Sequence, residues 1–188
     1  MKIPENQQII ISGVGGQGVL FVTRLLAEAA IAQGLSVITS ETHGMAQRGG
    51  TVVSHLKVGD FASPLIRPGQ ADGLIALKAE SVAVHGGYVR PAGWIVANSG
   101  EPLNSQATTA VMTLDAESVA RQINNRRAIN LVMLGYSLTR LAQACGGANA
   151  LFCSLAEIQA VVAKRLADKK VLRDAALEAL AAGAQSTP

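Results

Sequence analysis

The chain has 188 residues and a net charge of +3, and it is 49% hydrophobic but only 15% charged. This composition excludes a disordered chain and predicts a core of Ala, Val, Leu and Ile. The basic residues form no stripe with aromatics, and no run of about 18 uncharged apolar residues occurs, so we expect neither a nucleic-acid surface nor a membrane span. The polar start, MKIPENQQ, is unlike a secretory signal, and we expect a cytoplasmic protein.

The first half of the chain predicts a strand, a glycine turn, a helix and a second strand. An Ile-rich run at 7–13 is typical of a buried strand, residues 19–34 have helical periodicity, and a strand is expected at 35–40. This order is a βαβ unit, which predicts a largely parallel sheet. The run at 51–59 alternates like a strand, but it returns too soon for a helical crossover, so we expect it to run antiparallel to a neighbour.

The rest of the chain alternates strands and helices before a helical C-terminal third. We expect a connection at 63–72, strands at 73–77 and 93–98, an edge strand within 102–114, and helices at 78–86, 115–123, 128–145, 154–166 and 168–182. Asp115 and the pair Ser154 and Glu157 are predicted helix caps, and Gly183 is predicted to end the last helix. The fold class is therefore α/β: a Rossmann-like three-layer sandwich with a mostly parallel sheet, in one domain over residues 1–188.

The glycine turn GVGGQG fits the spacing G-x-G-x-x-G at Gly13, Gly15 and Gly18. Glycines at a strand–helix turn let a phosphate approach the helix N-terminus, which predicts a nucleotide site, and Glu41 then stands where an acid would bind a ribose. The extra Gly16 and Gln17 do not suit a simple dinucleotide site. Two other interpretations stay open: close packing of helix on sheet, and a subunit interface.

A second polar segment, THGMAQRGG, occupies residues 42–50 between two predicted strands. His43, Gln47 and Arg48 are candidates to orient a substrate or a partner loop, and Arg48 is suited to a phosphate or carboxylate. Gly49 and Gly50 permit close backbone approach. The alternative for Arg48 is an exposed ion pair of little consequence.

Few residues have the spacing of a metal site. Cys145 and Cys153 form no CxxC pair, and the three histidines are well separated, so we expect buried thiols and neither a metal nor an iron–sulfur site. His55 and His85 are interpreted as structural. Asn130, in an otherwise apolar predicted helix, needs a hydrogen-bond partner.

The glycine turn followed by TSETHGMAQRGGTVVSHLKVG resembles the gamma-type domain of the 2-oxoacid:ferredoxin oxidoreductases, and within that family the small (beta) subunits of the indolepyruvate type. The resemblance continues through SPLIRPGQADGLIAL and NLVMLGYSL and covers roughly residues 7–140. It implies that residues 1–188 form a single pyruvate/ketoisovalerate oxidoreductase gamma-type domain. The pairing of the glycine turn with the Gln47–Gly50 segment is its most specific part.

The resemblance implies an enzyme subunit that is inactive alone. Such enzymes oxidatively decarboxylate a 2-oxoacid, here indolepyruvate or another arylpyruvate, to an acyl-CoA and pass electrons to ferredoxin. Thiamine diphosphate, Mg and [4Fe-4S] clusters are expected on a large partner subunit, with coenzyme A on or beside it, and a homodimer is also compatible with the sequence. This division fits the residues, since Gly59–Asp60–Phe61 is not the Gly-Asp-Gly of a thiamine site and Asn124–Asn125 is better interpreted as a turn.

The expected cofactor-binding residues are those of the two glycine segments: Gly13, Gly15, Gly16, Gln17, Gly18, Arg48, Gly49 and Gly50. Arg48, His43 and Gln47 are the candidates for a catalytic role. A stand-alone nucleotide- or coenzyme-A-binding module, or an NAD-dependent reductase that uses Glu41, stays open as an alternative.

Overall fold

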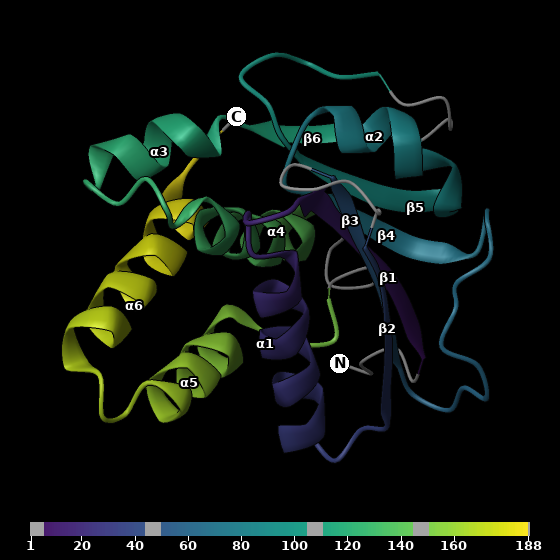
Figure 1. The fold of residues 1–188 in the computed structure, drawn as a ribbon, viewed down its shortest axis with the longest axis horizontal. Coiled ribbons are helices and arrows are strands. Elements are labelled where there is room, and N and C mark those ends of the chain that lie inside the picture. Colours follow the sequence, from purple (N-terminus) through teal and green to yellow (C-terminus); the bar gives the residue numbers. More distant parts are fainter. Residues whose placement is uncertain (1–5, 44–49, 105–110, 145–150, 188) are drawn as a thin grey trace.

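The computed structural model describes residues 6–43, 50–104, 111–144 and 151–187. It confirms the α/β class, and its six-stranded sheet is mixed, in the order β2-β3-β1-β4-β5-β6 (Figure 1). The strands are β1 (Gln7–Val14), β2 (Val37–His43), β3 (Thr51–Val58), β4 (Ala71–Ala76), β5 (Val89–Asn98) and β6 (Val111–Leu114). The helices are α1 (Val19–Ala32), α2 (Glu80–His85), α3 (Ala116–Gln122), α4 (Ile129–Ala144), α5 (Leu155–Arg165) and α6 (Lys170–Gln185), with a short 3-10 turn η1 (Gly86–Tyr88).

The sheet is more mixed than the βαβ pattern alone predicts. Strands β1, β4, β5 and β6 pair in parallel, but β3 lies between β1 and β2 and is antiparallel to both. The antiparallel direction expected for 51–59 is confirmed. A simple βαβ unit would place β2 beside β1, whereas the return of β3 into that gap moves β2 to the edge of the sheet.

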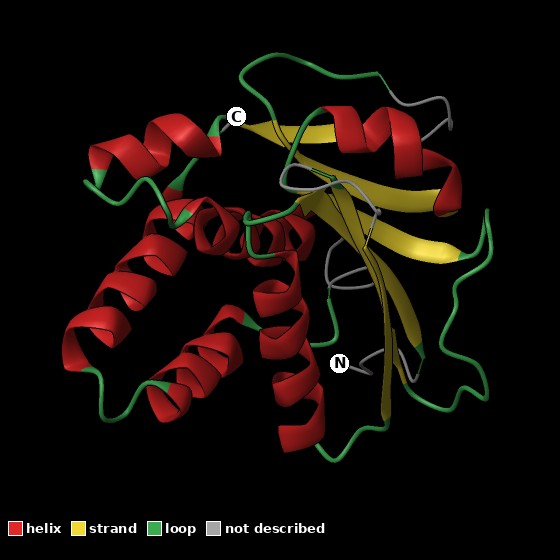
Figure 2. Cartoon of the chain, viewed as in Figure 1, coloured by secondary structure: helices red, strands yellow, loops and turns green. Residues whose placement is uncertain are grey.

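The helices cover the two faces of the sheet unequally, as Figure 2 shows. Helices α1 and α4 pack on one face against alternate strand residues such as Ile9, Ile11 and Val96. The other face carries a smaller cluster that includes Ile10 and Val82. Helix α5 contacts α1, and α6 packs along α4. The helical C-terminal third therefore thickens one side of the molecule.

Most of the helix ends predicted from the local sequence are confirmed. Asp115 Oδ1 accepts a hydrogen bond from Ser118 N at 2.9 Å, and Ser154 with Glu157 forms the predicted capping box. Gly34 has a φ of 77° just past the end of α1. Gly183 is the exception, because α6 continues to Gln185; the expected helix end at Gly183 is wrong.

None of the helices in the described ranges is long and apolar enough to cross a membrane.

Candidate functional site

Three strand ends meet at the edge of the sheet where β1 finishes. The register pairs Val14 of β1 with Thr51 of β3, and His43 of β2 with Val52. This is also the carboxyl edge of the parallel strands, since β4 and β5 run in the same direction as β1. The glycine turn and the segment between β2 and β3 therefore emerge at one edge, where open α/β sheets bind their ligands.

A backbone hydrogen bond joins the two glycine segments directly. Gly15 N donates to Gly50 O at 3.0 Å. Gly49, Arg48 and Gln47 lie outside the described residues, and of His43 only the backbone, the last residue of β2, is described. The structure thus joins Gly50, which follows the 44–49 segment, to the glycine turn, while His43, which precedes that segment, ends β2 at the same edge of the sheet.

Gly13 and Gln17 shape the turn from within. Val14 N donates to Gln17 Oε1 at 2.9 Å, and Gln17 N donates to Val14 O at 3.1 Å, so the side chain and the backbone of one residue close the turn. A Cβ on Gly13 would lie 2.7 Å from Gln17 Oε1. The close-packing interpretation therefore accounts for Gly13, and Gln17 acts on the turn itself.

Gly16 and Gly18 hold the turn in backbone conformations that other residues rarely adopt. Their φ values are 94° and 83°, and Gly18 is the N-cap of α1. Gly15 and Gly16 are exposed, and no side chain within the described ranges caps the first turn of the helix. Free N–H groups and the positive end of the helix dipole make this helix start suited to an anion.

The turn opens onto a cavity of about 400 Å³. Apart from the glycines its lining is mostly apolar, with Val19, Leu20 and Phe21 from the first turn of α1 and Val52 from β3. Arg24, one helical turn further on, is exposed and is the charged residue in that lining. An apolar cavity with one guanidinium and a helix N-terminus suits a ligand that carries both an apolar and an anionic part.

The sequence alone does not single out Arg24. It lies inside a helix predicted as a whole, and only its spacing after Leu20 and Phe21 places it on the cavity side. Periodicity could have indicated the face, but the cavity itself depends on β3 lying beside β1.

Asn130 supports the same helix start from the far side. Its Oδ1 accepts from Leu131 N at 2.9 Å, which gives the expected hydrogen-bond partner within its own helix. A Cβ on Gly18 would overlap the Asn130 amide nitrogen. The start of α4 therefore packs on the start of α1, and a side chain at position 18 would require the Asn130 amide to shift, in addition to the strain of the left-handed φ.

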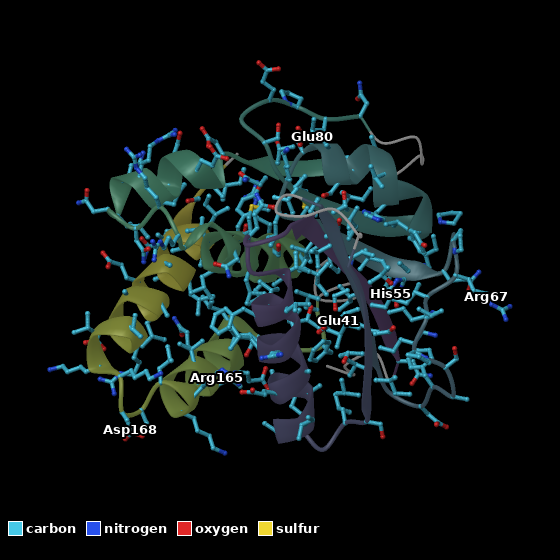
Figure 3. The ribbon with its side chains drawn as sticks, viewed as in Figure 1. Glu41, His55, Arg67, Glu80, Arg165 and Asp168 are labelled. Atoms are coloured by element: carbon cyan, nitrogen blue, oxygen red, sulfur yellow. The ribbon has the colours of Figure 1, made fainter. Side chains whose placement is uncertain are left out.

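Glu41 does not take the place of a ribose-binding acid. It is exposed on β2, opposite Ser54 of β3 (Figure 3), and β3 separates it from β1. Neighbouring strands are about 4.8 Å apart, so Glu41 lies two strand spacings from the glycine turn. The expectation that Glu41 stands where a dinucleotide fold needs it is wrong, because of the inserted strand.

The second face of the sheet buries a small cluster of polar and aromatic side chains. Ser12 Oγ and His85 Nδ1 are 2.8 Å apart, and Ile66 N donates to His55 Nδ1 at 3.2 Å. The Tyr88 ring lies 5.7 Å from that of His55 and 6.1 Å from that of His85, between ring centroids. Burial lowers the pKa of both histidines, and for His55 the charges of His85 and Lys57 lower the pKa further. These contacts agree with the structural interpretation of both residues.

We expect the free energy of unfolding to decrease as the pH falls below about 6.5, the ordinary pKa of histidine. Both histidines have lower pKa values folded than unfolded, so below that pH the unfolded chain binds more protons. The slope is at most about 1.4 kcal/mol per pH unit for each histidine. Urea unfolding between pH 5 and 7.5 measures it. The double variant His55→Gln and His85→Gln should show a smaller dependence of the unfolding free energy on pH. An unchanged dependence would contradict its attribution to the two histidines.

No group of three or more His, Cys, Asp or Glu in the described ranges is arranged to hold a metal ion. Cys153 is buried, and burial raises the pKa of its thiol, which disfavours a thiolate ligand. Asp60 N donates to Asn6 Oδ1, and Asn124 turns the chain after α3. Cys145 lies outside the described residues.

The fold and this edge define an open α/β domain with a glycine turn and an open cavity at the carboxyl ends of its strands, the place where such sheets usually bind ligands. The chain belongs to the pyruvate ferredoxin/flavodoxin oxidoreductase family, whose model matches residues 8–186. It is 34% identical over 147 residues to the indolepyruvate oxidoreductase subunit IorB of Archaeoglobus fulgidus. The aligned region covers 68% of this chain and 73% of that protein.

Two solved structures share the fold. The pyruvate oxidoreductase subunit PORC of Thermotoga maritima superimposes with a TM-score of 0.77 at 21% identity, over 97% of both chains. The second is the 2-oxoglutarate:ferredoxin oxidoreductase of Magnetococcus marinus with 2-oxoglutarate, coenzyme A and succinyl-CoA bound. It superimposes with a TM-score of 0.74 at 19% identity, over 98% of this chain and 32% of that one. The same fold thus occurs both as a separate subunit and as part of a longer chain.

Proposed function

We propose that this chain is the small, gamma-type subunit of an indolepyruvate-type 2-oxoacid:ferredoxin oxidoreductase. In this proposal residues 1–188 form one Rossmann-like sandwich domain in the cytoplasm, and a large partner subunit completes the enzyme. The 34% identity to an indolepyruvate oxidoreductase subunit supports the choice of an arylpyruvate substrate.

The observation that carries the proposal is the hydrogen bond between Gly15 N and Gly50 O. It makes the two most specific segments of the sequence a single structural unit at the carboxyl edge. In this proposal the segment that carries His43, Gln47, Arg48 and Gly49 meets a second chain or its ligand.

In this proposal the large partner subunit and this chain contribute different chemistry. Thiamine diphosphate with Mg supplies the decarboxylation, and [4Fe-4S] clusters the route to ferredoxin, on the partner subunit. This chain's glycine turn and the start of α1 receive a phosphate of coenzyme A, and Arg24 adds a charge-assisted hydrogen bond to it. Gln17 holds the turn closed, while Arg48, His43 and Gln47 orient the substrate or a partner loop.

The test is reconstitution with the large subunit. We expect indolepyruvate- and coenzyme-A-dependent reduction of ferredoxin or methyl viologen when the two chains are co-expressed, and background rates from either chain alone. Full activity of the large subunit without this chain would refute the proposal.

A pair of variants tests the role of the cavity within that experiment. Arg24→Gln should raise the KM for coenzyme A about tenfold, the usual value of one charge-assisted hydrogen bond, and leave the KM for indolepyruvate nearly unchanged. Arg67→Gln is the matched control, because Arg67 is exposed on a connection and points away from the body of the molecule (Figure 3).

The second candidate is a stand-alone module that binds coenzyme A or another nucleotide. The cavity of about 400 Å³ beside the glycine turn favours it over an NAD-dependent reductase, since Glu41 is two strands away. Calorimetric titration of the isolated chain separates the candidates: tight NAD(H) binding that Glu41→Ala abolishes would support the reductase, and tight coenzyme A binding without a partner would support the module.

A further inference from the structure

A group of arginines surrounds the turn between α3 and α4. Arg121, Arg126 and Arg127 line a hollow of about 430 Å³ together with Asn124 and Asn125. We call these five residues the arginine corner. An adjoining hollow of about 220 Å³ shares Arg121 and Arg126 and adds Glu117 and Ile129. The arginine corner shares no lining residue with the cavity at the glycine turn.

The backbone of the corner is held by a dense set of hydrogen bonds. Asn124 N donates to Arg121 O at 3.0 Å, Asn125 N to Ala120 O at 2.9 Å, and Ala128 N to Asn125 O at 3.0 Å. Asn124 itself has a φ of 53°, a left-handed conformation that asparagine tolerates better than most residues. The turn therefore presents Arg126 and Arg127 from a fixed backbone.

The positive charge of the corner is only partly balanced by neighbouring acids. The ion pairs of the described ranges are Lys78–Glu80, Arg90–Asp72, Arg165–Glu28 and Arg173–Asp174, and none of them involves the corner. Hydrogen bonds from Ser118 and, to a smaller extent, the charge of Arg121 lower the pKa of the Asp115 carboxyl, and Arg121 Nη2 donates to the hydroxyl of Ser118. Glu117 lines only the smaller hollow.

The start of helix α4, which follows the corner, also lacks negative charge. Arg126 and Arg127 come just before α4, whose first turn contains no acidic residue. A helix start is the positive end of its dipole, so cations there are unfavourable and acids are the usual choice. Two arginines at such a position, in a concave surface, are stabilised when an anion joins them.

We propose that the arginine corner binds a phosphate group of a small ligand. Guanidinium groups form paired hydrogen bonds with phosphate oxygens, and the two asparagine amides can donate to the same oxygens or to a ribose. The concave shape and the volume suit a phosphorylated small molecule better than a flat acidic protein surface. This site does not depend on the proposed subunit function.

The test uses the isolated full-length chain and calorimetric titration at low salt, with inorganic pyrophosphate and adenosine 3′,5′-bisphosphate as probes. The double variant Arg126→Gln and Arg127→Gln should weaken binding of the phosphate probe at least about tenfold. Arg67→Gln, an exposed arginine outside the described hollows, should bind like the wild type. Thermal unfolding of each variant checks that the fold is unchanged, and Arg126→Glu with Arg127→Glu should abolish binding.

The two probes distinguish the sources of the phosphate. Equal affinity for both assigns the corner to the phosphate alone, and tighter binding of the bisphosphate assigns it to a nucleotide. Binding of neither probe, or equal binding by wild type and double variant, would overturn the proposal. Normal pyrophosphate binding by the double variant with loss of assembly with the large subunit would instead make the corner a protein-docking surface.

Discussion

Replacing Gly183 with alanine is expected to destabilise the chain by about 2–3 kcal/mol, a cost typical of overpacking in a tight interior. Gly183 lies inside α6, and a Cβ there would overlap the Val132 carbonyl of α4. The contact is reciprocal, because a Cβ on Gly135 of α4 would overlap the Leu180 carbonyl of α6. Backbone atoms in a helix do not move aside cheaply, so the two helices would have to separate.

The sign of this effect is diagnostic. In an open helix, glycine to alanine stabilises by about 1 kcal/mol through helix propensity, so destabilisation can come only from the packing. Gly87→Ala is the control, since a Cβ there meets no atom within 4 Å. Urea unfolding measures all variants, and a neutral or stabilising Gly183→Ala would show that α4 and α6 are further apart than described.

A double variant tests whether one contact is involved. Once Gly183→Ala has moved α6 from α4, Gly135→Ala should cost less than it does alone. We therefore expect the double variant to be less destabilised than the sum of the two single variants, as is usual for residues in one interface.

The same glycines show where reasoning from sequence fails. Gly183 after an Ala- and Leu-rich run is a reasonable helix stop, and the structure carries the helix past it. The cause is tertiary, because α6 needs a residue without a side chain where it meets Val132. Gly34 has the same local signal and does end α1, since its Cβ position is open and its φ is 77°. Local sequence does not distinguish these two glycines.

The order of the strands in the sheet also depends on contacts that local sequence does not reveal. Periodicity predicted β1, α1 and β2, and the short connection before β3 correctly predicted its antiparallel direction. It did not predict which strand β3 would join, since register and neighbours depend on contacts far apart in the chain. That placement decides which residues border the glycine turn, because it separates Glu41 from the turn and brings Gly50 to it.

The candidate site was predictable as a pair of segments but not as a cavity. The glycine turn and the 42–50 segment are visible in the sequence, and their hydrogen bond agrees with that pairing. Arg24 emerges only when α1 is placed against β3. Asn130 was identified as a buried polar group in need of a partner, but its contact with Gly18 depends on how two helix starts pack.

That contact leads to the second large effect. Gly18→Ala is expected to destabilise the chain by about 2 kcal/mol, part from the left-handed φ of 83° and part from overlap with the Asn130 amide. Gly16→Ala is the matched control, because its φ is 94° but its Cβ position is open, so it should show the conformational cost alone, about 1 kcal/mol.

A double-mutant cycle with Asn130→Ala separates the conformational cost of Gly18→Ala from the cost of overlap with the Asn130 amide. Truncating Asn130 makes room for the new methyl group, so Gly18→Ala should cost about 1 kcal/mol less in the Asn130→Ala background than in the wild type. Urea unfolding of the four chains gives this coupling. Strict additivity would mean that the amide does not touch Gly18, and the packing of the α4 start on the α1 start would then have to be revised. A coupling of the expected size would make Asn130 the residue that fixes the helix start at which we place the phosphate of coenzyme A.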